Sequence, residues 1–273
     1  MSTVDQSLAL PSILRVGLSR GNLELRAFFR EWTAVIFVFA LPAVLLVLFG
    51  SIFHTAHDGI TQGQFMTGGL IAAGLVSTSF LSMGTGIAQD RDNRTLKRLR
   101  GTPVSAVSYF IGKVVLVAVT SLAETVLLLA VGVLLFGVAL PHGAARWATF
   151  AWVFALGVAS CTLLGIAASG LTRSARSAPP VLNLIFLVLE FMSGVFIVPI
   201  TTLPRWMVDA ASFFPLKWTA QGIRSVFLPA GMMSMEEAGG WEHGKTFLVL
   251  GAWCLIGLAL CLATFRWTGR RDR

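Results

Sequence analysis

The chain has 273 residues, of which 55% are hydrophobic and only 12% are charged, with a formal net charge of +8. An average soluble domain is about one quarter charged. This composition, with a mean hydropathy of +0.78, excludes an ordinary soluble domain and indicates a protein whose solvent is lipid. The three cysteines fall inside apolar runs, so neither a disulfide framework nor a metal cluster is indicated.

The first expected element is a helix over residues 12–31. Its apolar residues Leu14, Leu18, Leu25 and Phe28 are spaced three, four or seven apart, with arginines between them. This pattern is typical of a helix that lies in the membrane interface with its arginines at the lipid headgroups. A plain cytoplasmic extension of the first membrane span is the alternative.

Six long apolar runs follow, and each is close to the length of about 20 residues that a helix needs to cross a bilayer. Glu124 and Glu190 are the only charged residues in them, and Pro42 predicts a kink in the first. The sequence therefore predicts an all-α integral membrane protein with six transmembrane helices, over residues 33–53, 65–88, 114–140, 148–171, 180–200 and 246–265.

The basic residues divide unevenly between the two sides of this topology. Sixteen of the 21 lysines and arginines precede the first span, lie in the loops after spans two and four, or follow the last span; five lie on the other side. The positive-inside rule then places both termini in the cytoplasm. Topology accounts for the positive charge, and no nucleic-acid partner is needed.

The segment between spans five and six is more than a loop. Pro204 begins one short amphipathic helix, Pro215 ends it, and Lys217–Phe227 can form a second. Both are too short to cross a bilayer. Residues 203–228 are therefore predicted to form an extracytoplasmic, re-entrant pair of helices.

One short motif points to a different class of protein. The stretch GGWEHGKT, residues 239–246, fits the phosphate-binding pattern G-x-x-x-x-G-K-[ST]. That loop works only between a buried strand and a soluble helix. Here MMSMEEA precedes it and an apolar span follows, so we interpret the match as coincidence.

Two further segments carry a family resemblance. DRDNRTLKRLRGTPVS (residues 90–105) resembles the signature that follows the second span in ABC-2 type transporter permeases, although Arg94 stands where that family often has glycine. FMSGVFIVPITTLPRWM (191–207), followed by FPLKW (214–218) and GIR (222–224), resembles the family's second signature, with Phe214 where asparagine is common.

The resemblance implies one subunit of a bacterial plasma-membrane exporter driven by ATP. Two separate ATPase subunits bind ATP and Mg²⁺, and a second permease copy or a paralogue completes the complex. In this chain no catalytic residue, cofactor or metal ligand is expected. Membrane lipid is the remaining expected partner.

The resemblance also places the ATPase contact on a cytoplasmic coupling loop over residues 90–105. The mixed charges, with Leu96 and Leu99 three apart, suit a short amphipathic helix that docks on a protein; a loop that contacts only anionic lipid is the alternative. The first helix is expected to complete the contact. The residues assigned to it are Asp90, Arg91, Asp92, Arg94, Leu96, Arg98, Leu99, Arg26 and Glu31.

The two intramembrane carboxylates are candidates for the transport path. A carboxylate at that depth is costly unless it is protonated, paired or hydrated. Glu190, with Phe186, Phe191 and Met192, is the first candidate and Glu124 the second. The alternative is a buried glutamate hydrogen-bonded to a neighbour, such as Asn183 or Ser193 for Glu190.

A hydrophobic drug or antibiotic is the expected substrate, and polysaccharide or lipid export is the alternative within the family. An ion-coupled secondary transporter using Glu124 and Glu190 is an alternative from a different class. That class predicts inverted repeats, and the two halves of this chain do not match.

Overall fold

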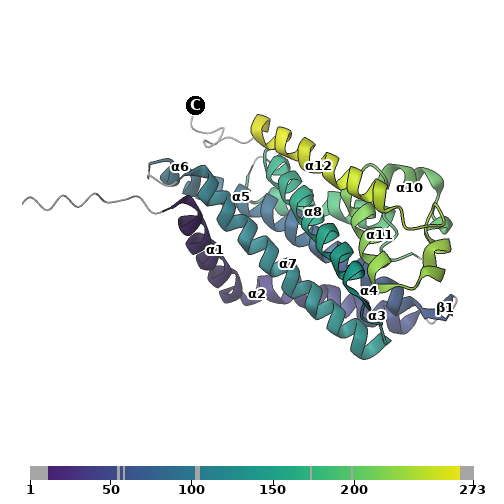
Figure 1. The fold of residues 1–273 in the computed structure, drawn as a ribbon. Helices are drawn as coiled ribbons and strands as arrows, with labels where there is room; N and C mark the ends of the chain where they lie inside the picture. The colour runs from purple at the N-terminus through teal and green to yellow at the C-terminus, as the bar shows by residue number, and fades with distance from the viewer. Residues whose placement is uncertain are drawn as a thin grey trace, which may run out of the picture.

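The computed structural model describes residues 12–53, 56–57, 59–101, 105–172, 174–197 and 199–264. In these ranges the chain is a bundle of helices, with one two-residue hairpin in which β1 (Ala56–His57) pairs with β2 (Ile60–Thr61) (Figure 1). The helix α6 lies at one end of the bundle and α10 at the other. These are called the α6 end and the α10 end below.

The helical elements are given in chain order. They are α1 (Ile13–Arg30), α2 (Trp32–Val35), η1 (Ile36–Ala40), α3 (Leu41–Ile52), α4 (Gln62–Val76), η2 (Ser77–Ser82), α5 (Met83–Asp92), α6 (Thr95–Arg100), α7 (Ala106–Phe136), α8 (Ala144–Ser169), α9 (Ala178–Met192), η3 (Ile200–Thr202), α10 (Arg205–Ala211), α11 (Pro215–Phe227), η4 (Ala230–Met235) and α12 (His243–Thr264).

Five helical segments of the described chain are long and apolar enough to cross a membrane. They are Trp32–Ile52, Gln62–Asp92, Val107–Phe136, Ala144–Ser169 and His243–Ala263. Only 6% of the apolar window in the first is buried and 22% in the last, against 67% in Gln62–Asp92. The first and last segments thus leave their apolar side chains for lipid to cover, while Gln62–Asp92 runs through the middle of the bundle.

The predicted fifth span, 180–200, is corrected by the structure. Its helix, α9, begins at Ala178 and ends at Met192, and 15 residues of α-helix rise about 22 Å, less than the roughly 30 Å of bilayer hydrocarbon. The chain turns at Gly194, whose φ of +66° favours glycine. A Cβ there would also lie 2.6 Å from Ile200 Cγ1, so the turn is packed as well as sharp.

Two of the spans contain a π-helical turn. In the first, η1 lies directly before Pro42; a proline in a helix removes one backbone donor and crowds the preceding turn, which explains a local change of hydrogen-bond register. In the second, η2 separates α4 from α5 without any proline. Such single π-turns are frequent at functional sites.

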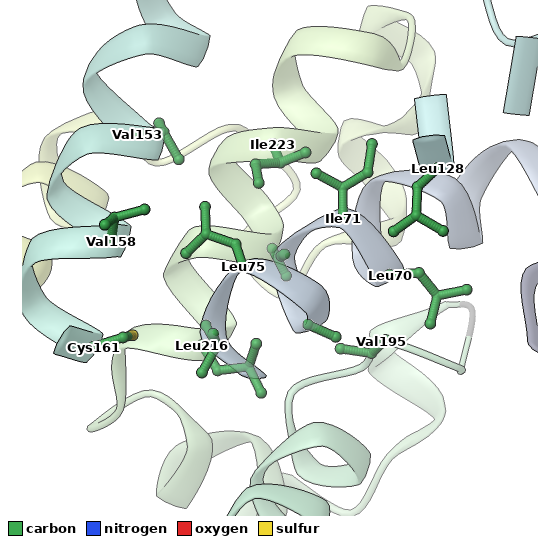
Figure 2. Close-up of a cluster of buried hydrophobic side chains, with 14 of the residues drawn as sticks. Leu70, Ile71, Leu75, Leu128, Val153, Val158, Cys161, Val195, Leu216 and Ile223 are labelled. Carbon is green, nitrogen blue, oxygen red and sulfur yellow. The ribbon is translucent and has the colours of Figure 1, made fainter. Parts of the chain in front are cut away.

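The core is built around α4. Leu70, Ile71 and Leu75 of α4 pack among side chains of α7, α8 and α11 (Figure 2). Leu128, Val153, Val158, Leu216 and Ile223 are among those partners, and Val195 from the segment after α9 joins them. Glycines let other segments approach α4: a Cβ at Gly69 would lie 2.9 Å from the Val195 carbonyl oxygen.

The two short helices α10 and α11 lie where the pair over 203–228 is predicted, and α11 packs against α4, α8 and α12. Two basic residues seven apart on α11 pair with two consecutive acids of the segment after η4. Arg224 Nε lies 2.7 Å from Glu236 Oε1 with both side chains fully buried, and Lys217 pairs with Glu237. These ion pairs fasten the segment before α12 onto α11.

The stretch GGWEHGKT has no strand before it within the described residues. It begins at Gly239 (φ +63°) and runs into α12, which starts at His243. Lys245 pairs with Glu242 (2.5 Å), and the Thr246 side chain is buried. The motif is thus the entry into an apolar helix, which agrees with its interpretation as coincidence.

Candidate functional site

The turn into α6 depends on Arg94. It is the one non-glycine residue with positive φ among those described (φ +58°, ψ +18°). Left-handed backbone costs an L-residue roughly 1–2 kcal/mol, which explains why glycine suits this position. The turn is closed by the Arg98 guanidinium, whose Nη2 donates to the Asn93 carbonyl oxygen (3.0 Å).

The side chains of α6 divide into a buried and an exposed group. Leu96 is 1% exposed and packs inside the chain, where α6 lies against α5. This corrects the partner-facing position that the sequence suggested for Leu96. Leu99 is half-buried, while Arg94, Lys97 and Arg98 are exposed. The surface of α6 is therefore mostly basic.

The last charged residues of α5 are fastened to the connection between α8 and α9. Arg91 donates from Nη1 to the Ser169 carbonyl (3.1 Å) and from Nη2 to the Thr172 carbonyl (2.7 Å). It thereby satisfies carbonyls at the end of α8 that have no helical partner. Asp92 Oδ2 accepts from the Ala175 backbone N–H (2.6 Å). Arg91 and Asp92 therefore hold α5, and with it α6, against a second part of the bundle.

Asp90 belongs to a charged cluster that joins three helices. Its Oδ2 accepts from the Tyr109 hydroxyl (2.7 Å) and pairs with Lys113 Nζ (2.9 Å), both on α7. Lys113 also pairs with Glu24 Oε2 of α1 (2.7 Å), and Glu24 Oε1 lies 3.4 Å from Arg20 Nε. The Arg20 guanidinium stacks over the Tyr109 ring at 4.7 Å. We call these five residues the three-helix cluster.

The three-helix cluster is shielded from water. Tyr109 is 1% exposed and the Lys113 side chain 10% exposed. Ion pairs are stronger where solvent is excluded, and a connected network resists piecemeal disruption. With two cations between two carboxylates, the charges balance. The cluster therefore couples the position of α5 to those of α1 and α7.

The packing face of α1 is made of small residues. Gly17 and Gly21 are its buried residues; a Cβ on Gly17 would lie 2.6 Å from Ile111 Cγ2, and one on Gly21 would lie 2.7 Å from Val115 Cγ1. This spacing lets two helices approach closely. The predicted apolar residues Leu14 and Leu18 are exposed on the remainder of the helix.

Arg26 and Glu31 are exposed but do not lie at α6. Helices α1 and α7 run in the same direction, since the Ser108 hydroxyl donates to the Ile13 carbonyl (3.0 Å) and Gly21 meets Val115. Glu31 follows the last residue of an 18-residue helix, about 27 Å from its start. The structure thus separates these two residues from the others predicted at the coupling loop.

Glu124 is buried between α7 and α4. Its Oε1 occupies the notch of Gly74, where a Cβ would lie only 2.3 Å away, and its Oε2 has no hydrogen-bond partner in the described chain. Next to it the Thr78 and Ser121 hydroxyls share a hydrogen bond (2.6 Å) at the start of η2. Glu124 is 2% exposed, so it lines no open path in this conformation.

The other predicted path residues lie together on α9. Glu190 is 8% exposed, and neither Asn183 nor Ser193 bonds to it; Ser193 Oγ is itself without a partner in the described chain. Phe191 is 48% exposed and packs on Phe196 (ring centroids 5.3 Å apart). Phe186 and Met192 are half-buried. This end of α9 therefore presents aromatic surface next to a buried acid.

Sequence reasoning missed most of the three-helix cluster. Arg20 and Lys113 enter the sequence analysis only through the count of basic residues, and neither Glu24 nor Tyr109 is singled out there. Two features of the sequence could have indicated these residues. Arg20 and Glu24 are four apart on one helical face, and Tyr109 is the only tyrosine in the chain.

Comparison with known families agrees with this architecture. The model of the ABC-2 type transporter family matches residues 21–228, which include α4 to α11 and most of α1. The chain therefore belongs to the ABC-2 type transporter family, the membrane domain of ABC transporters. No curated protein matches the chain.

Proposed function

We propose that this ABC-2 permease exports a hydrophobic, drug- or antibiotic-like molecule across a bacterial plasma membrane, with energy from two ATPase subunits that dock at α6. ATP and Mg²⁺ bind to those subunits. The observation that carries the proposal is the three-helix cluster, which ties the base of an exposed basic helix to two helices of the membrane bundle.

The proposed docking surface is the exposed part of α6 and its preceding turn. Arg94 and Arg98 supply charge and Leu99 supplies a half-buried apolar contact. Asp90, Arg91 and Asp92 act behind this surface through their internal bonds. Arg26 and Glu31 form a second, separate contact along α1.

The proposed relay runs from α6 to the spans. A push on α6 moves α5, because only Asn93 and Arg94 separate the two helices. Asp90 then pulls on Lys113 of α7, and the ion pair between Lys113 and Glu24 carries α1 with it. The discontinuity at η2 gives the α4–α5 span a place to bend.

The proposed topology puts the α6 end in the cytoplasm, following the distribution of basic residues. In it, α1 is the interfacial elbow helix, α9 is the helical part of the predicted fifth span and does not cross the bilayer on its own, and α10 and α11 form the re-entrant pair. A second copy of the chain or a paralogue completes the path. The exposed apolar residues of α9, among them Leu184 (64% exposed) and Leu187, support a partner or lipid on that face.

The proposed path runs beside α9, where Glu190, Phe186, Phe191 and Met192 contact the substrate. Polysaccharide or lipid export is the alternative within the family. One observation favours an ion-coupled mechanism instead: Glu124 carries an oxygen without a partner in the described chain, next to a π-turn. Ion coupling predicts transport without any ATPase.

The test uses the full chain in lipid nanodiscs with its ATPase. We expect the wild-type chain to bind the ATPase and stimulate ATP hydrolysis. Arg98→Glu is expected to weaken ATPase binding about tenfold, because a favourable charged contact becomes repulsive. Arg205→Glu, a charge reversal on the exposed first residue of α10, is the matched control and is expected to bind normally (Figure 1).

Lys113→Met tests the proposed relay separately from ATPase docking. It leaves α6 intact but places the Glu24 and Asp90 carboxylates together without their shared cation. We expect normal ATPase binding with stimulation reduced to near the ATPase's basal rate. Equal binding by Arg98→Glu and Arg205→Glu would refute docking at α6. If the chain alone hydrolyses ATP and Lys245→Ala abolishes that activity, the proposal that separate subunits hydrolyse ATP is refuted.

A further inference from the structure

A pocket at the α10 end lies outside the coupling site and the proposed path. Helices α8 and α12 run side by side and begin at this end, since Trp152 packs on Phe247 and Cys254 Sγ contacts the Leu156 carbonyl oxygen. The pocket between them, α11 and η4 has a volume of about 230 Å³. Its lining residues are Ala145, Arg146, Thr149, Ser225, Ala230, Met233, Trp241 and His243.

Polar side chains supply part of the pocket lining. Ser225 Oγ donates to the Gly222 carbonyl (2.6 Å) and lies 2.9 Å from His243 Nε2, so these two side chains are held together. Arg146, whose side chain is exposed, adds a guanidinium to the lining.

The positive charge of Arg146 is not balanced locally. Each acid of the adjoining segment has its own basic partner: Glu236 pairs with Arg224, Glu237 with Lys217 and Glu242 with Lys245. Among the described residues no carboxylate pairs with Arg146. The first turns of α8 and α12 add the partial positive charge of helix N-termini.

The apolar part of the lining is formed by Trp241, Met233 and Ala230. A volume of about 230 Å³ falls below the roughly 300–1,000 Å³ of clefts that enclose a drug-sized ligand. Tryptophans at span ends lie at the headgroup level of a bilayer, and both Trp147 and Trp241 are at the starts of spans here. The pocket thus suits a small anionic head whose apolar remainder continues into lipid.

We propose that this pocket binds the phosphate of an anionic lipid headgroup in the leaflet opposite α6, with Arg146 as the charged contact, and so fixes α11 against α8 and α12. The bound lipid is a resident of the bundle, not cargo. Its contacts reach α11 through Ser225 and η4 through Met233, and the ion pairs of Arg224 and Lys217 join α11 to the segment that follows η4.

The test is retention of lipid by the purified full chain, measured by native mass spectrometry after exchange into detergent with equal phosphatidylglycerol and phosphatidylcholine. We expect one retained phosphatidylglycerol per wild-type chain and about tenfold lower retention by Arg146→Gln, as loss of a charge-assisted hydrogen bond predicts. Lys245→Gln is the control, because Lys245 is an exposed cation at the same end that does not line the pocket.

Equal retention by Arg146→Gln and Lys245→Gln would overturn the proposal. So would equal retention of the two lipids by the wild-type chain. A parallel experiment measures the thermal unfolding of the delipidated chain with inorganic phosphate or with phosphatidylglycerol. If phosphate raises the unfolding temperature as much as the lipid does, and Arg146→Gln removes this effect, the ligand is a soluble phosphate ester and the lipid assignment is overturned. None of these readouts depends on ATPase docking, so failure here leaves the proposed transport function untouched.

Discussion

Glu236→Gln tests whether the ion pair at the α10 end is as deeply buried as the structure has it. The side chains of Arg224 and Glu236 are both fully buried, with Nε and Oε1 2.7 Å apart. Arg224 also lies over the Phe65 ring (4.8 Å) and reaches the Gly194 carbonyl (3.5 Å). The substitution keeps the shape of the acid but leaves the guanidinium charge buried without a counter-charge.

The expected loss in free energy of unfolding is about 3–5 kcal/mol, the usual cost of breaking a buried pair by removing one partner. The matched control is Glu242→Gln, six residues later, whose partner Lys245 is 68% exposed. An exposed pair contributes little to stability, so this variant is expected to unfold nearly as the wild type does.

The assay is unfolding of the chain in mixed micelles, followed by the fluorescence of its eight tryptophans. A double variant, Arg224→Met with Glu236→Leu, removes both charges and is expected to recover most of the loss, because two apolar residues of similar volume are often tolerated where a buried pair stood. Similar losses for Glu236→Gln and Glu242→Gln would refute the reasoning. If the double variant is less stable than Glu236→Gln, the shape of these side chains and not their charge determines the stability of this site.

Two further predictions concern the spans and the turn into α6. Arg94→Gly is expected to raise the free energy of unfolding by about 1 kcal/mol, because it relieves left-handed strain; unchanged or lower stability in the same micelle assay would contradict this. Gly74→Ala is expected to cost about 1–3 kcal/mol, because its Cβ would lie 2.3 Å from Glu124 Oε1. Adding Glu124→Ala to it should recover stability relative to Gly74→Ala alone, and a purely additive double variant would show that the two residues do not meet.

The membrane class and most helix positions could be read from the chain, because lipid imposes a length on every apolar run. The exceptions are instructive. The run 180–200 is apolar except for Glu190 and a few uncharged polar residues, but its helix ends at Met192 because Gly194 turns the chain and Arg224, 30 residues later, binds the Gly194 carbonyl. A contact across that separation leaves no local periodicity to detect.

The sequence predicts where along the chain the candidate site lies, but not which residues form its contacts. The charge and the leucine spacing of residues 90–105 marked the segment, and Arg94 marked its unusual turn. The local sequence does not show whether a charged side chain of this segment faces solvent or pairs inside the bundle. Glu24 shares Lys113 with Asp90 only because the glycine face of α1 lets that helix lie against α7.

The sequence by itself determined the lipid solvent of this protein, five helices long enough to cross it and the basic loop, because each follows from composition or spacing along the chain. The family was indicated by two segments that resemble its signatures. The tertiary structure alone decided which charges are partners. Leu96 is buried inside the chain, Arg224 pairs with Glu236, and Glu124 lies against Gly74. These pairings depend on helix contacts between residues far apart in sequence, and burial makes them strong enough to matter.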